Sequence, residues 1–175
     1  MKLNFGCGDN RLIGWKNFDA ELDISKRLPF DDNSANYIFC EHCVEHIPYY
    51  QAIEFFKECR RVLKPTGVVR IVVPSIEKIW HSQNHKYYEF TTKWQSIGPT
   101  DRGAMHAILY AHGHQTAWTA SLLESTLYYA GFDNVLQCSP HLSAHGPLNN
   151  VEGHHKAIGE EFNAIESIIF EGTSF

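Results

Sequence analysis

The stretch KLNFGCGDN, from Lys2 to Asn10, decides the fold, because it joins a short apolar run to a Gly-x-Gly loop. An apolar run that ends in glycine is typical of a buried strand followed by a tight loop. Gly6 and Gly8 carry no Cβ, so the backbone of this loop can approach a ligand closely. Its amides would suit a nucleotide or an amino-acid carboxylate. Taken alone, the pattern fits a glycine turn without a ligand equally well.

Outward from this loop, strand patterns alternate with helix patterns. Strands are expected at 37–40, 68–74, 132–138 and 166–172, and helices at 48–63 and 116–131. Such alternation predicts a mostly parallel α/β sheet with helices on both faces. Sheets of this kind bind ligands at the carboxyl ends of their strands. Residues 75–113 show only weak periodicity and are rich in aromatic residues and histidine.

Composition excludes several classes of protein. The 175 residues are expected to form a single domain, 1–175, with a formal net charge of -5 and no basic stripe, which argues against a nucleic-acid partner. No apolar run is long enough to span a membrane, and the first residues lack the apolar core of a signal peptide. Five cysteines, an odd number in a chain of this length, favour the reducing cytoplasm.

Two acids follow the first loop at positions suited to a nucleoside. Asp19 ends the short run Asn17-Phe18-Asp19, where a carboxylate could accept both ribose hydroxyls. Asp23 could receive the exocyclic amine of an adenine, with Ile24 against the ring. A nicotinamide cofactor is disfavoured, because Arg11 stands where a dinucleotide fingerprint wants glycine or alanine.

The stretch CEHCVEH, from Cys40 to His46, has three interpretations. A structural zinc site wants four ligands, and Cys40, Cys43 and His46 provide at most three. A thioredoxin-like redox pair also lies at a strand-to-helix junction. The third interpretation, a turn that follows a buried strand in a cofactor-binding fold, is preferred, and no metal ligands are assigned.

Four segments in order resemble the motifs of class I S-adenosylmethionine-dependent methyltransferases, and most closely those of the small type 11 methyltransferase-like proteins. They are KLNFGCGDN, the NFD after Trp15, LPFDDNSANYIFCEHCVEHI and CRRVLKPTGVVRIVVP. The resemblance covers residues 3–74 and resumes loosely near 113–135 and 166–172. It implies a Rossmann-like, seven-stranded, mostly parallel sheet whose last strand is antiparallel.

The resemblance also implies S-adenosyl-L-methionine as cofactor and a role for individual residues. The cofactor-binding set is Gly6, Cys7, Gly8, Asp19, Asp23, Ile24, Glu41 and His42. Within it, the loop Gly6–Gly8 would line the methionine and ribose part, and Glu41 and His42 would border the methyl group. Asn4 and Asn10 depart from the family pattern, which usually has an acid and a third glycine at these places.

The activity implied is methyl transfer to a small-molecule acceptor, such as a sugar or another metabolite. His42 and His114 are the candidate catalytic residues, since a neutral histidine can act as a general base. Most other histidines are expected at the surface or in loops; the irregular set is His106, His141, His145, His154 and His155. The alternative function is a non-catalytic protein of the same fold that binds the cofactor or a partner.

Recognition of the acceptor is expected from two segments, the variable segment 75–113 and the loop 140–152. The aromatic residues of the first segment are Trp80, Tyr87, Tyr88, Phe90 and Trp94. They fit either simple packing over the sheet or a pocket for a planar or sugar-like ring. The sequence does not separate these two possibilities.

Overall fold

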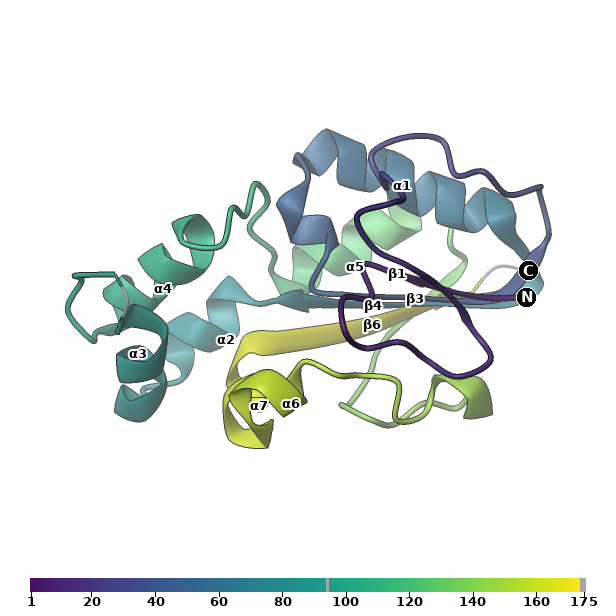
Figure 1. Ribbon diagram of the computed structural model, residues 1–175. Coiled ribbons are helices and arrows are strands. Elements are labelled where there is room, and N and C mark those ends of the chain that lie inside the picture. The colour runs from purple at the N-terminus through teal and green to yellow at the C-terminus, as the bar shows by residue number, and fades with distance from the viewer. Residues whose placement is uncertain (94, 174–175) are drawn as a thin grey trace.

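The computed structural model describes residues 1–93 and 95–173, and its centre is a six-stranded sheet (Figure 1). The strands are β1 (Lys2–Phe5), β2 (Lys16–Phe18), β3 (Ala35–Glu41), β4 (Leu63–Pro74), β5 (Asn134–Gln137) and β6 (Ser167–Thr173). Their order is β2-β1-β3-β4-β6-β5, and β6 runs antiparallel to both of its neighbours. The predicted Rossmann-like α/β fold with an antiparallel last strand is confirmed.

The number of strands corrects the prediction, because the described residues form six strands rather than seven. The connection from the edge strand β2 to β3 consists of turns, which the side chain of Arg61 fastens to helix α1 (Tyr49–Val62). Arg61 donates hydrogen bonds to the backbone oxygens of Phe30, at 2.8 Å, and Leu28, at 3.1 Å. The carbonyls of Leu28 and Phe30 are thus bonded to Arg61 rather than to a neighbouring strand. The segment between β2 and β3 therefore adds no strand to the sheet.

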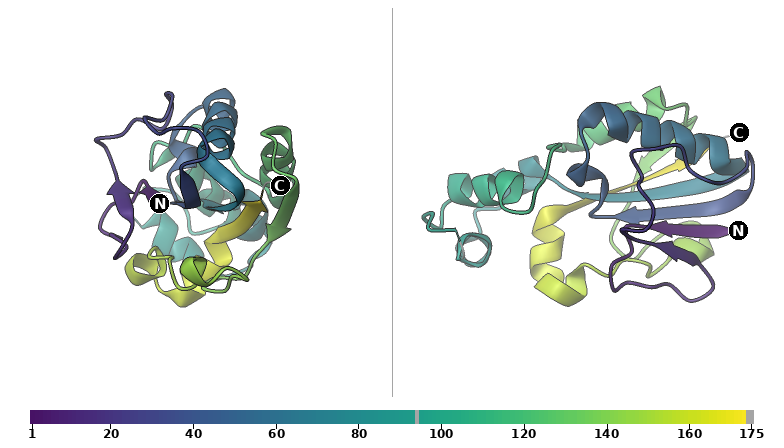
Figure 2. Two further views of the ribbon diagram at one scale, coloured as in Figure 1. Left: turned by 90° about the vertical axis from the view of Figure 1, so that its right-hand side faces the viewer. Right: turned by 45° about the horizontal axis from the view of Figure 1, so that its top comes forward.

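Helices cover one face of the sheet, and a long loop with two short helices covers the other (Figures 1 and 2). On the first face lie α1 and α5 (Ala120–Tyr129), close to the expected bounds. On the other face lie α6 (His155–Ile158), α7 (Glu160–Glu166) and the loop after β5, which contains the 3₁₀ helix η2 (Gly146–Leu148). The main apolar core fills the space between the sheet and α1 and α5.

Residues 75–113, expected to be irregular, form a small helical lobe at one end of the molecule (Figure 1). It contains α2 (Ile76–His81), α3 (His85–Thr92) and α4 (Asp101–Tyr110). A side chain caps each N-terminus: those of Ser75, Asn84 and Thr100 accept a backbone N–H in the first turn. These helices are too short to give a clear apolar period, which is why the sequence pattern missed them.

The aromatic residues of the lobe mostly serve packing. Tyr87 and Tyr88 are buried in a separate apolar cluster, and Phe90 packs on Phe162 with ring centroids 5.0 Å apart. Trp80 is partly exposed, and Trp94 lies outside the described residues. Within the part of the chain described, no helix has the length and apolar character needed to cross a membrane.

Candidate functional site

The carboxyl ends of β1, β2 and β3 place three of the predicted residues along one edge of the sheet. Gly6 follows β1, Asp19 follows β2 and His42 comes directly after β3, and the three strands are parallel. Gly6 has φ +63°, and a Cβ there would lie 2.5 Å from the Cβ and Sγ of Cys43. Only glycine allows the two chain segments to meet this closely.

A cavity of about 420 Å³, named the Asp19 cavity, opens at this edge. Its lining residues are Gly6, Asp19, Ala20, Leu22, Asp23, Ile24, Cys43, His46 and Ile47. Four predicted residues therefore meet here, and apolar Leu22 and Ile24 offer a surface for a flat ring. Asp23 Oδ1 accepts hydrogen bonds from the Ser25 hydroxyl, at 2.6 Å, and amide, at 3.0 Å, and these hold the pKa of Asp23 to about 2.

A second cavity of about 220 Å³, named the Glu41 cavity, adjoins the first and shares Gly6 with it. Its lining residues are Gly6, Cys7, Asn10, Glu41, His42, Gly153 and His154. The Glu41 carboxylate accepts the backbone N–H of Gly153 at 2.8 Å and of His154 at 3.2 Å. These bonds fasten the loop after β5 to the end of β3, and Asn10 Nδ2 donates to the Val151 oxygen at 2.8 Å, which joins the same loop to the loop after β1. The exposed Gly8, expected to contact the cofactor, lines neither cavity.

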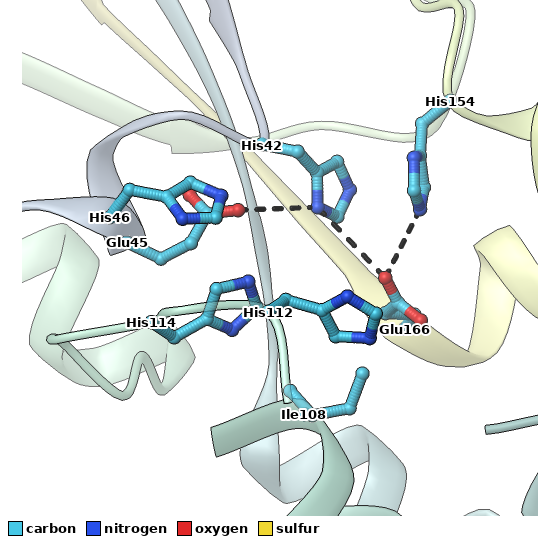
Figure 3. Close-up of a pocket in the computed structure, with 8 residues that line it drawn as sticks. All are labelled: His42, Glu45, His46, Ile108, His112, His114, His154 and Glu166. Carbon is cyan, nitrogen blue, oxygen red and sulfur yellow. Dashed lines mark hydrogen bonds and ion pairs between the residues drawn. The ribbon is translucent and has the colours of Figure 1, made fainter. Parts of the chain in front are cut away.

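The histidine cavity, of about 380 Å³, is the third hollow of the site (Figure 3). Its lining residues are His42, Glu45, His46, Ile108, His112, His114, His154 and Glu166. They come from the turn after β3, the 3₁₀ helix η1 (Val44–His46), α4 and the chain after it, the loop before α6, and α7. The predicted pair His42 and His114 is thus brought to one cavity. Sequence reasoning missed Glu45, His154 and Glu166 as members of it.

His42 is the junction between cavities, and both of its ring nitrogens have partners. Its Nε2 lies 2.9 Å from the Ser167 hydroxyl, which itself donates to Asn163, so Nε2 must carry the hydrogen. Its Nδ1 faces Glu45 at 3.5 Å and Glu166 at 3.9 Å. Burial alone would lower the pKa of His42, but the carboxylates outweigh it and the net pKa is raised. His42 therefore favours the charged form.

His114 lies across the same cavity in a different electrostatic setting. Its pKa is lowered, chiefly by burial, and the nearby charge of Glu45 opposes this shift only in part. Its ring meets that of His46 edge-on, with centroids 4.8 Å apart. The next two amides, of Gln115 and Thr116, donate to the backbone oxygen of Glu45 and fix the approach of this segment. His114 is therefore neutral near pH 7 and able to accept a proton.

Glu45 is the unexpected member of the site. Its side chain is fully buried, yet neither carboxylate oxygen accepts a hydrogen bond from any residue that the structure describes. Its charged partner is His42, whose Nδ1 lies 3.5 Å from Oε1. A fully buried carboxylate that accepts no hydrogen bond is costly even beside such a partner, so this group calls for a functional explanation. The signal that could have found it is a repeat within CEHCVEH, where Glu41-His42 recurs four residues later as Glu45-His46.

The cysteines of CEHCVEH bear on the metal-clip and redox interpretations. Cys40 is fully buried at the end of β3, and Cys43 packs against the loop glycine Gly6; both are free thiols. The hydrogen bond with Cys43 and burial raise the pKa of Cys40 well above its usual value. A reactive thiol needs a lowered pKa, so this environment favours the interpretation as a turn of a cofactor-binding fold.

Comparisons with known proteins agree with this geometry. A family model described as "Methyltransferase domain" matches residues 10–71. A SAM-dependent methyltransferase from Archaeoglobus fulgidus has a similar structure, with a TM-score of 0.55 at 14% identity over 98% of this chain and 84% of that chain. None of the curated proteins matches this sequence.

Two further solved structures share the fold. One is a chain in the complex of the Haloferax volcanii Trm112 methyltransferase activator, with a TM-score of 0.58 at 15% identity over 99% of this chain and 81% of that one. The other is phosphoethanolamine N-methyltransferase 2 of Haemonchus contortus in complex with S-adenosyl-L-methionine, with a TM-score of 0.55 at 10% identity over 99% and 48%.

These findings confirm the resemblance stated from the motifs. The chain has the fold of class I S-adenosylmethionine-dependent methyltransferases, and its match to the methyltransferase domain is consistent with the type 11 group. The family match covers residues 10–71, and the structural likeness at 14–15% identity shows the fold.

Proposed function

We propose that this chain transfers a methyl group from S-adenosyl-L-methionine to a small-molecule acceptor, such as a sugar or another metabolite, bound in the histidine cavity. One observation carries the proposal: each pair of cavities shares a residue. Gly6 joins the Asp19 and Glu41 cavities, His46 joins the Asp19 and histidine cavities, and His42 joins the Glu41 and histidine cavities. A ligand that spans the first two cavities would therefore present its middle to the third.

The lining residues fit the chemistry of the cofactor from end to end. Leu22 and Ile24 would contact the adenine, and Asp19 would accept the ribose hydroxyls, as expected from the sequence. Glu41 would lie at the methionine end and supply a carboxylate for the ammonium group. This role matters because Asn4, at the usual position of the acid, is buried and donates instead to Asn10 and Asn17.

Side chains of this protein would position the reacting groups and accept the proton of the acceptor. When bound, S-adenosyl-L-methionine supplies a methyl group already activated by its sulfonium. An acceptor hydroxyl or amine in the histidine cavity would need to lose a proton, and His114 is the group proposed to accept it. A positioned base of this kind contributes about 10²–10⁴-fold in rate. His42, with Nε2 on the Ser167 hydroxyl and Nδ1 facing Glu45, would border the methyl group and hold Glu45 in place.

The setting proposed for this reaction follows from composition and from the free thiols. All five cysteines are unpaired, which suits the reducing cytoplasm. A net charge of -5 suits a small acceptor better than a nucleic acid. The single domain 1–175 would recognise its acceptor partly through the segment 75–113, from which Ile108 and His112 line the histidine cavity.

A non-catalytic protein that binds the cofactor or a partner is the second candidate. The observation that favours it is Asn4, since an amide committed to loop bonds brings no negative charge to the methionine end. The two candidates differ in whether a methyl group leaves the cofactor.

Two measurements separate these outcomes. Thermal unfolding with S-adenosyl-L-methionine or S-adenosylhomocysteine tests binding, and an excess of a hundredfold over Kd should stabilise the protein by about 2.7 kcal/mol. A screen of small hydroxyl and amine acceptors with methyl-labelled cofactor then tests transfer. Binding with transfer supports the enzyme, and binding with no transfer to any acceptor supports the second candidate. No stabilisation by either compound contradicts the enzyme and the cofactor-binding protein, and leaves the partner-binding protein of the same fold.

A further inference from the structure

A separate group of side chains lies on the sheet face opposite α1 and α5, outside the three cavities of the proposed methyltransferase site. It surrounds a hollow of about 310 Å³ lined by His141, Asn150, Glu152, His155, Lys156 and Glu160. His141 belongs to the loop after β5, His155 begins α6 and Glu160 begins α7. The ligand atoms of these last three residues lie within 4.8 Å of one another.

The distances match those expected around one small ion. His141 Nε2 lies 3.3 Å from Glu160 Oε2, and His155 Nε2 lies 3.6 Å from Glu160 Oε1. Two ligand atoms bound at about 2.0–2.1 Å to a tetrahedral ion stand about 3.3–3.4 Å apart. Two imidazoles and one carboxylate form a ligand set that Zn²⁺ commonly takes, with water in the fourth position.

A buried carboxylate fixes the orientation of His141. Glu152 Oε2 lies 3.4 Å from His141 Nδ1 and accepts the backbone N–H of His141 at 3.2 Å. Glu152 is itself buried and held by Arg70, whose Nε lies 2.6 Å from Oε1. A carboxylate on the far nitrogen of a ligating histidine is the usual outer partner in metal sites, since it fixes the tautomer and turns the other nitrogen to the ion.

The two imidazole rings of the group lie close together. The rings of His141 and His155 stand edge-on with centroids 4.7 Å apart, so two charged imidazoliums here would repel each other. One divalent ion satisfies a nitrogen of each ring without this repulsion.

Two other groups of this kind lie in the histidine cavity: His42 with His154 and Glu166, and Glu45 with His46 and His114. In the first, an ion would have to compete with two hydroxyl groups, because the Tyr87 hydroxyl donates to Glu166 and His42 Nε2 lies 2.9 Å from the Ser167 hydroxyl. The second borders the proposed cofactor and acceptor. They serve as the internal comparison for the test below.

We propose that His141, His155 and Glu160 bind one divalent transition-metal ion of the Zn²⁺ type, with Glu152 orienting His141. The ion would tie the loop after β5 to the start of α7. Gly153 and His154, which lie directly before His155, close the Glu41 cavity. The ion would therefore brace the segment that covers the methionine end of the cofactor site.

Titration of the apo protein with Co²⁺ tests this directly and needs neither cofactor nor acceptor. We expect one Co²⁺ per chain with the intense visible bands of tetrahedral coordination, displaced by one equivalent of Zn²⁺. His155→Ala should weaken binding by more than the roughly 10–100-fold typical of lost outer partners. Glu160→Gln, at an exposed side chain, should do likewise, and it covers the case in which His155→Ala does not fold.

His46→Ala is the comparison variant, because it breaks the competing group in the histidine cavity, and it should leave Co²⁺ binding unchanged. The proposal is overturned if no Co²⁺ binds below about 0.1 mM, if the spectrum is octahedral, or if binding survives His155→Ala and Glu160→Gln. Loss of binding in His46→Ala alone would place the ion in the histidine cavity and would also overturn it. Failure to bind S-adenosylhomocysteine would count against the proposed methyltransferase and leave this result untouched.

Discussion

His42 and His154 stack on each other with ring centroids 3.9 Å apart and ring planes inclined by 28°. His42 follows β3, whereas His154 belongs to the loop before α6, so the contact joins two distant segments of the chain. Glu166 on α7 holds His154 through a hydrogen bond of 3.1 Å. The loop after β5 thus forms one wall of both the Glu41 cavity and the histidine cavity.

Alanine substitutions at Gly6 and Gly8 should separate two effects: the close approach of Cys43 and the positive φ of the backbone. Gly6 and Gly8 both have positive φ, so alanine at either costs about 1–2 kcal/mol of folding free energy. Only at Gly6 would the new Cβ also meet Cys43, at 2.5 Å; at Gly8 it meets nothing within 4 Å. Gly6→Ala should therefore destabilise the protein more than Gly8→Ala and should abolish binding of S-adenosylhomocysteine. Urea unfolding and calorimetric titration measure both effects, and equal losses would contradict the account.

Removing the carboxylate of Asp19 should weaken binding of the cofactor without affecting the fold. Asp19 is exposed and lines the Asp19 cavity, where it would accept hydrogen bonds from both ribose hydroxyls. A hydrogen bond to a charged group is worth about 1.5–3 kcal/mol, so Asp19→Ala should raise Kd about 10–100-fold. Asp31→Ala removes the same charge from an exposed turn before β3 and should leave Kd unchanged. A similar Kd for wild type and Asp19→Ala would remove Asp19 from the site.

His114, as the proposed base, should set the acid limb of the pH profile of kcat/KM. The pKa of His114 is lowered, so the base form persists below pH 6.5 and kcat/KM should fall only at lower pH, as His114 takes up a proton. His114→Asn should reduce turnover by about 10²–10⁴-fold and remove this acid limb. His106→Asn, an exposed histidine of α4, is the matched control. An unchanged acid limb in His114→Asn would show that another group is the base.

The raised pKa of His42 predicts that its contribution to the free energy of unfolding falls as pH rises. Its pKa is raised in the folded protein, so its ion pairs with Glu45 and Glu166 contribute fully below about pH 6.5. This contribution is lost as pH rises through the raised pKa. The difference in unfolding free energy between wild type and His42→Asn should accordingly shrink from pH 6 to pH 9, as urea unfolding would measure. A difference that grows over this range would contradict the assigned charge.

The buried guanidinium of Arg70 joins the loop after β5, through Glu152, to strand β6, through Glu171. Arg70 on β4 is fully buried, with Nη2 2.5 Å from Glu152 and Nη1 2.5 Å from Glu171. Arg70→Met would leave two buried carboxylates without their partner and should cost about 3–5 kcal/mol in unfolding free energy. Lys57→Met, which breaks the exposed pair with Glu54, should change stability little. Equal effects of the two changes would contradict the importance of burial.

Local motifs predicted the part of the site that is built close in sequence. Gly6, Asp19 and Ile24 follow strands or turns whose patterns are readable in the first 24 residues, and parallel pairing then brings them to one cavity. Gly8 has φ +45°, is exposed and lines neither cavity, so its contact with the cofactor stays a prediction. A glycine needed for a positive φ and a glycine needed for contact with a ligand look the same in a sequence.

Long-range members of the site carried no such signal. His154 lies in a loop without periodicity and reaches the cavity only because Glu41 and Glu166 bind it. Glu45 was given no role from the sequence, and the segment 114–116 that crosses over η1 and bonds its backbone oxygen is distant in the chain. The helices of residues 76–110 pack mainly among themselves and against α7, so their apolar positions follow no single face.

The most direct test of the account is a crystal structure of the protein with S-adenosylhomocysteine. The account predicts the ribose hydroxyls on Asp19, the adenine against Ile24, and the sulfur between His42 and His46, facing the histidine cavity. Density for the compound at any other place, or no density at millimolar concentration, would contradict it.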